Sequence, residues 1–203
     1  MQRIRFRTSA AILLAAAGIS AAVLLGVHRL EAANNDLSQA DLDVIVAQAV
    51  ASASLTNSGF RTSPTVQKTK MQIAIVARDG KLLRVYSMPD AWVGSIDIAI
   101  AKARTGAFFS SNQNALTSRI IGVVSQPGGP LWGIGASNQL GISGSAEFRN
   151  GIITFPGGVP LYKNGQLVGG IGVSGDGVDQ DEAVAFAGAA GFEPGAGVAK
   201  LGF

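Results

Sequence analysis

Two pairs of short apolar segments, each joined by a tight-turn dipeptide, constrain the fold of this 203-residue chain more than any other feature. The turns are Asp79-Gly80 in the first pair and Asn164-Gly165 in the second. Such dipeptides favour the two-residue turns that join antiparallel strands, because both central residues tolerate positive φ angles. The expected strands are residues 71–77 and 81–87 around the first turn, and 159–162 and 166–173 around the second. The sequence therefore predicts two β-hairpins.

Three other segments have the apolar spacing or the end signals of helices, and they are residues 36–55, 95–109 and 179–191. In the first, Ser38 and Asp41 can satisfy the free amides of an opening turn, and apolar residues then recur at steps of three and four. Ser95 is the expected N-cap of the second helix. The order helix, hairpin, helix, loop, hairpin, helix predicts an α+β fold in which helices cover a mainly antiparallel sheet.

The segment between the second helix and the second hairpin is rich in glycine and lacks a long periodic run. We expect residues 122–151 to form an extended loop that contains at most one short strand. Loops of this length in a compact domain are usually functional or mobile.

The N-terminus has the pattern of an export signal. Arg3, Arg5 and Arg7 precede an apolar run at residues 9–27, which His28 then closes. The run is about as long as the roughly 20 residues that span a bilayer as a helix. We therefore predict that residues 1–32 are a signal peptide or an N-terminal membrane anchor helix. Residues 36–203 would then form a periplasmic or secreted domain, which residues 9–27 would anchor to the inner membrane if the leader is retained.

Composition excludes several classes of function. Beyond Ala32 the chain has twelve basic and twelve acidic residues, so this domain has no positive surplus with which to bind the phosphates of a nucleic acid. The chain has no cysteine, and His28 in the leader is its only histidine. Thiolate sites, imidazole-based zinc sites and Ser-His-Asp triads are therefore excluded from the domain.

Two further motifs have structural interpretations. Residues 170–175 spell G-x-G-x-x-G, but they belong to the return strand of a hairpin rather than to a βαβ unit. Glycines at alternate strand positions favour close approach of a helix or a ligand. The acidic residues at 176–182 are typical of a helix N-terminus, where the helix dipole favours negative charge.

Lys102, Arg104 and Thr105 lie together in the alanine-rich second helix, and Pro156-Gly157-Gly158 forms a bend before the second hairpin. Charged residues on such a helix most often form a solvated face. Their functional interpretation is recognition of an anion, such as a propionate, by Lys and Arg.

Taken in order, several segments resemble the GlcG/HbpS family of haem-binding proteins, and also the C-terminal part of PduO-type corrinoid proteins. The resemblance extends over residues 37–192. The matching segments are residues 73–76, 79–80, 88–91, 95–105, 155–161, 164–165, 168–175 and 180–182.

This resemblance implies a profilin-like sandwich, symmetric homo-oligomers and binding of haem or a related tetrapyrrole. Some members are secreted and act with a sensor kinase in iron or redox sensing. A histidine serves as iron ligand in some relatives, whereas the domain of this chain has none. The side chains that could replace it are Tyr86, Tyr162, Met71, Met88 and Lys102.

We therefore expect an exported protein that binds a tetrapyrrole or a small anionic ligand, and we assign no catalytic residue. The expected pocket lies between the helix that carries Lys102, Arg104 and Thr105 and the bend at Pro156, Gly157 and Gly158. Two alternatives are an enzyme acting on a small organic acid and a structural or partner-binding module. In the last case, residues 122–151 would be the contact surface.

Overall fold

The structure is a computed structural model that describes residues 36–132 and 151–203. The predicted leader or anchor, residues 1–32, and a large part of the predicted 122–151 loop lie outside the described residues. Leu37–Phe203 forms one compact unit. No helix in the described part of the chain has the length and apolar character needed to cross a bilayer.

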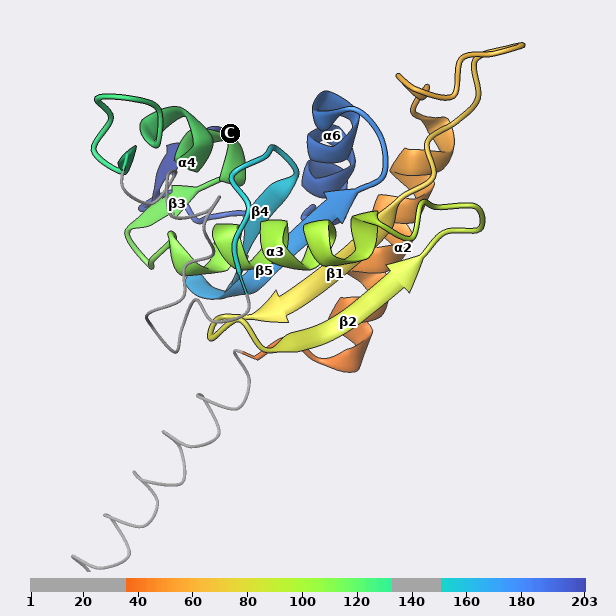
Figure 1. Ribbon diagram of the computed structural model, residues 1–203. Coiled ribbons are helices and arrows are strands. Elements are labelled where there is room, and N and C mark those ends of the chain that lie inside the picture. The colour runs from red at the N-terminus through yellow and green to blue at the C-terminus, as the bar shows by residue number, and fades with distance from the viewer. Residues whose placement is uncertain (1–35, 133–150) are drawn as a thin grey trace, which may run out of the picture. The chain divides into compact units, whose positions relative to one another are not determined.

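A four-stranded antiparallel sheet forms the centre of this unit, with strand order β2-β1-β5-β4 (Figure 1). Its strands are β1 (Gln72–Ala77), β2 (Leu82–Ser87), β4 (Gly158–Lys163) and β5 (Gln166–Ser174). Both predicted hairpins are confirmed, since β1 pairs with β2 and β4 pairs with β5. Asn164 and Gly165 have positive φ angles of 52° and 73°, as a type I′ turn requires. Pairing of β1 with β5 joins the two hairpins into one sheet.

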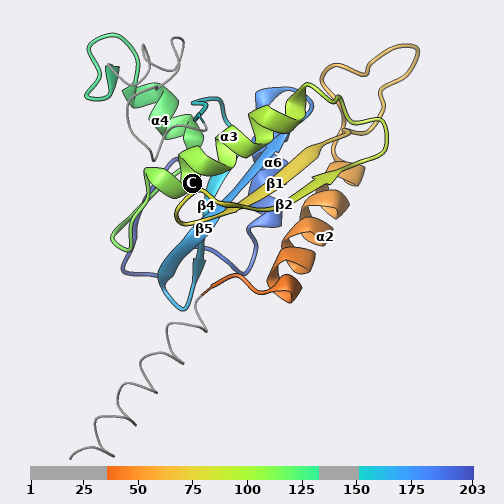
Figure 2. The same ribbon diagram turned by 60° about the horizontal axis from the view of Figure 1, so that its bottom comes forward.

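Helices cover both faces of the sheet, and Figure 2 shows the helices on its two sides. One face carries α2 (Gln39–Leu55) and α6 (Val178–Gly188), and the other carries α3 (Ser95–Phe108). The capping box predicted from Ser38 and Asp41 is confirmed at the start of α2. The predicted α+β arrangement, with helices over an antiparallel sheet, is therefore confirmed.

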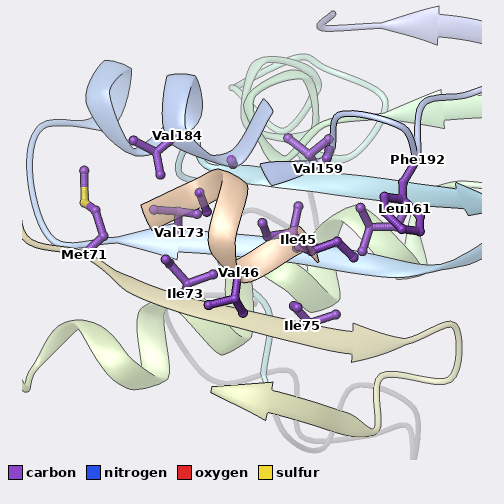
Figure 3. Packing of buried hydrophobic residues seen from close by; sticks show 14 of the residues in the cluster. Ile45, Val46, Met71, Ile73, Ile75, Val159, Leu161, Val173, Val184 and Phe192 are labelled. Carbon is purple, nitrogen blue, oxygen red and sulfur yellow. The ribbon is translucent and has the colours of Figure 1, made fainter. Parts of the chain in front are cut away.

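The larger core lies between the sheet and the pair α2 and α6. Branched side chains alternate along β1, β4 and β5 and meet those of the two helices (Figure 3). The central members are fully buried, and burial of each contributes roughly 1.5–3 kcal/mol. They include Ile45, Ile73, Ile75, Leu161, Ile171, Val173 and Val184.

On the other face, α3 lies directly against the backbone of β5. A Cβ atom at Gly172 would clash with the carbonyl oxygen of Ala99, and one at Gly170 would clash with that of Ala103. The glycines of the G-x-G-x-x-G segment therefore allow a helix to approach a strand closely, which agrees with their structural interpretation.

Three short elements were not predicted, because each is too short to show a period. They are β3 (Asn114–Leu116), α4 (Ser118–Val124) and β6 (Ala199–Leu201). β3 and β6 form a separate parallel pair. The start of the predicted 122–151 loop therefore belongs to a helix.

Residues 152–155 lead into β4 without forming a strand, and the Thr105 hydroxyl bonds both the amide and the carbonyl of Ile153. One other local prediction was wrong, because Ser95 is not the N-cap of α3. Gly94 takes that position, and Ser95 is the first helical residue, which the helix buries.

Candidate functional site

A pocket of about 260 Å³ opens where β5 ends and where α3 and α6 begin. Its apolar walls come from Phe60, Trp92, Ile98, Phe155 and Val178. Its polar surface comes from Ser95, Lys102, Ser174, Gly175, Asp176 and Asp181. A concave site with apolar walls and a few convergent polar groups is the usual form of a small-molecule site.

Three aromatic side chains in the walls are strongly exposed. The exposed fractions are 74% for Phe60, 61% for Trp92 and 58% for Phe155. Exposed aromatic residues that gather around one opening indicate a binding surface more strongly than single exposed apolar residues do.

The backbones beside these rings are held in place. The Trp92 carbonyl accepts a 3.2 Å hydrogen bond from the side-chain amide of Gln72. The Phe155 carbonyl accepts one of 2.6 Å from the hydroxyl of Ser118. The amide of Phe60 donates to the hydroxyl of Ser58 at 3.1 Å. The chain thus fixes each backbone position and leaves the ring exposed.

The floor of the pocket contains a buried ion pair. Lys102 Nζ lies 2.7 Å from Asp181 Oδ2 and donates a second hydrogen bond of 3.0 Å to the Val173 carbonyl. Only 2% and 3% of the two side chains are exposed. Burial lowers the pKa of Lys102 and raises the pKa of Asp181, and the attraction between the two charges opposes both shifts.

Asp176 ties the pocket wall that carries Phe60 to the start of α6. Its carboxylate accepts hydrogen bonds from the Ser58 hydroxyl and from the amides of Gly59 and Gly177, and it lies 3.4 Å from Arg61 Nη1. Burial alone would raise the pKa of Asp176, but these hydrogen bonds and the Arg61 charge lower it overall.

The structure brings Lys102 next to the predicted bend. A Cβ atom at Gly157 would lie 3.1 Å from Lys102 Nζ, and one at Gly158 would clash with the Lys102 carbonyl. The bend therefore packs directly on α3, and the pocket lies beside this contact rather than between its two segments.

Of the predicted site residues, Lys102 lines the pocket, whereas Arg104, Thr105 and the bend at 156–158 do not. Pro156 follows the wall residue Phe155. Thr105 is buried and bonds Ile153. The Arg104 Nε donates a 3.1 Å hydrogen bond to the Gly80 carbonyl, in the turn between β1 and β2. Binding of a ligand by these residues stays a prediction.

The aromatic walls were missed by the sequence analysis. Phe60, Trp92 and Phe155 come from three connections and are separated by 32 and 63 positions, and no periodic pattern relates them. A usable signal was their setting, because Trp92 follows the turn at Pro89-Asp90 and Phe155 precedes the bend at Pro156.

Of the proposed iron ligands, Lys102 alone lines the pocket. Met71 and Met88 are buried in the main core, and the Met71 amide lies 3.4 Å from Met88 Sδ.

The two tyrosines proposed as iron ligands also lie away from the pocket lining. The Tyr162 hydroxyl donates to the Ser111 carbonyl at 2.7 Å, and burial raises the pKa of Tyr162 to about 12. Tyr86 pairs with Ile73, whose side chain faces α2 and α6 on the opposite side of the sheet from α3. The described residues contain no group of three His, Cys, Asp or Glu side chains that could hold a metal ion.

Comparison with known proteins shows that two proteins of Citrobacter freundii share about half of this sequence. An uncharacterized 15.0 kDa protein of Citrobacter freundii, from the dhaT-dhaS intergenic region, is 33% identical over 112 residues, which cover 55% of this chain and 68% of that protein. The corrinoid adenosyltransferase PduO of the same organism is 33% identical over 113 residues, covering 56% of this chain. The match spans 29% of the length of PduO.

The crystal structure of a PduOC:heme complex has the same fold, with a TM-score of 0.59 and 28% identity. The similarity covers 79% of this chain and 97% of that one. Residues 37–190 match the protein family described as haem degrading protein HbpS-like. Because this match covers most of the chain, the protein belongs to the HbpS-like family.

Proposed function

We propose that this protein binds haem or a related tetrapyrrole, with the ring placed against the aromatic walls of the pocket. The observation that carries the proposal is the group of exposed rings, Phe60, Trp92 and Phe155, around one opening. A flat, conjugated ligand that covers these rings removes their apolar surface from water, which contributes about 25 cal/mol for each Å². The heme complex of the related PduOC and the HbpS-like family support this ligand class.

The size of the pocket defines how such a ligand would sit. A volume of 260 Å³ is slightly below the roughly 300–1,000 Å³ of typical small-molecule pockets. One edge of a tetrapyrrole would enter, and the remaining ring would lie over the exposed aromatic side chains. The ligand would therefore be partly open to solvent.

The proposal extends to the setting of the protein. The basic and apolar pattern of residues 1–32 supports export to the periplasm or the exterior, with residues 9–27 as the membrane anchor if the leader is retained. Helices on both faces of an antiparallel sheet support a fold of the profilin-like type. Homo-oligomers and a role in iron or redox sensing are proposed on the family resemblance.

Titration of the full chain with ferric haem tests the proposed function. We expect a shift of the Soret absorption band at micromolar haem, because the ring moves from water to an aromatic surface. Trp92→Ala should weaken binding about tenfold or more, since the loss of one large apolar contact is worth more than about 1.4 kcal/mol.

Trp132→Ala is the matched control. Trp132 is also exposed, at 48%, and does not line the pocket. The control should bind haem like the unchanged chain. Absence of a Soret shift, or equal binding by Trp92→Ala and the unchanged chain, would contradict the proposal.

A further inference from the structure

The charged side chains of the pocket, Lys102, Asp176 and Asp181, are already bound to other groups of the protein. Lys102 is held by Asp181 and Val173, and Asp181 also accepts a 3.1 Å hydrogen bond from the Asp176 amide. Asp176 accepts three further hydrogen bonds and faces Arg61. In the described ranges, the one buried side-chain atom without a partner is Glu182 Oε1, and Glu182 does not line the pocket.

Iron in haem proteins is held by His, Cys, Met or Tyr side chains. None of the residues that line the pocket is of these types. Met71, Met88 and Tyr162 are buried in core contacts, and Tyr86 belongs to the face of the sheet opposite α3. Residues 133–150, which the structure does not describe, also contain none of the four types. The residues of the pocket are therefore suited to contact with the ring of haem, and they include no usual ligand for its iron.

Lys102 is a poor replacement as an iron ligand. Its amine would have to lose its proton and leave Asp181, and the carboxylate would then remain buried without a counter-charge. The lining residues also offer no spare cation for a propionate, because the one cation among them, Lys102, is paired with Asp181, and Asp176 adds a second carboxylate to the lining. Arg61, near the pocket, is bonded to Asp176 and to the carbonyls of Gly175 and Asp90.

We infer that the pocket recognises a tetrapyrrole through its ring and not through its metal, so that a metal-free porphyrin binds as well as haem. This inference rests on the proposed function. It changes the ligand class from iron porphyrins to porphyrins in general. The propionates of the bound ligand point to solvent.

The test compares three ligands on the full chain: ferric haem, metal-free protoporphyrin IX and zinc protoporphyrin. Binding is followed by the absorption change of each porphyrin. We expect the three dissociation constants to agree within about threefold, because the ring contact is common to all. Trp92→Ala should weaken all three by a similar factor, and Trp132→Ala should weaken none.

His28→Ala is the decisive second variant, because His28 is the only histidine in the chain. We expect this variant to bind haem unchanged. Loss of haem binding in His28→Ala, or binding of haem at least about tenfold tighter than binding of metal-free porphyrin, overturns the inference while haem binding itself stands. Failure of all three ligands to bind overturns the proposed function instead.

Discussion

The Lys102–Asp181 pair is the most enclosed charged contact at the pocket. Two opposite charges that are 2% and 3% exposed stabilise each other only because both are hydrogen bonded, through Val173 and through the Asp176 amide. The pair also packs closely against the bend, because a Cβ atom at Gly157 would lie 3.1 Å from Lys102 Nζ. Removing one partner leaves the other charge without compensation.

Replacement of Lys102 should therefore destabilise the fold more than it affects any ligand directly. We expect Lys102→Met to lower the free energy of unfolding by about 3–5 kcal/mol, because the Asp181 carboxylate stays buried alone. The double variant Lys102→Met, Asp181→Leu should recover most of this loss. Urea unfolding monitored by circular dichroism measures the stability of the single and the double variant. An unchanged unfolding midpoint in the single variant would contradict the prediction.

The lowered pKa of Asp176 predicts that the free energy of unfolding depends on pH. Its folded pKa lies below the ordinary aspartate value, so its contribution is complete above the unfolded pKa and is lost as the pH falls through the folded value. The stability difference between the unchanged chain and Asp176→Asn should thus shrink as the pH is lowered from about 6 to about 3. Ser58→Ala should show the same trend with smaller amplitude. Urea unfolding at several pH values in this range tests the prediction. A stability difference between the two proteins that does not change with pH would count against a lowered pKa of Asp176.

At the scale of elements, the contact between α3 and β5 positions the pocket. Glycines at alternate positions of β5 let α3 lie against the strand, and α3 then carries Ser95, Ile98 and Lys102 to the pocket. At Gly170 and Gly172 no side chain of β5 stands between the strand and α3, so the fit depends on the absence of a methyl group at these two positions.

Gly172→Ala tests this contact. The added Cβ would clash with the Ala99 carbonyl, and we expect a loss of about 1–3 kcal/mol, the usual cost of overpacking. Gly197→Ala is the matched control, because a Cβ at Gly197 meets nothing within 4 Å. Thermal unfolding should separate the two variants, and equal melting temperatures would refute the proposed tight contact.

At the scale of the whole unit Leu37–Phe203, the main architecture was predictable because local sequence patterns determine its hairpins and its first helix. The dipeptides Asp79-Gly80 and Asn164-Gly165 define the two hairpins, and the spacing of apolar residues defines α2. The sequence also placed Lys102 near the bend at 156–158, as the structure finds.

The pocket itself was not predictable in the same way. It depends on where three connections end after the sheet has formed, and the exposure of Phe60, Trp92 and Phe155 follows from that tertiary arrangement. The partners of Lys102 were hidden for a similar reason, because Asp181 is 79 positions away and faces it only through the packing of α6 and α3 on the sheet.

The hydrogen bonds of Asp176 have a consequence for binding kinetics and affinity. Because the Asp176 carboxylate bonds both the Ser58–Gly59 segment and the Gly177 amide before α6, this wall of the pocket is already in place before the proposed ligand binds. Binding would then order little of the backbone. The remaining entropic cost would be the immobilisation of a few exposed rings, on the order of 0.5–1.5 kcal/mol each.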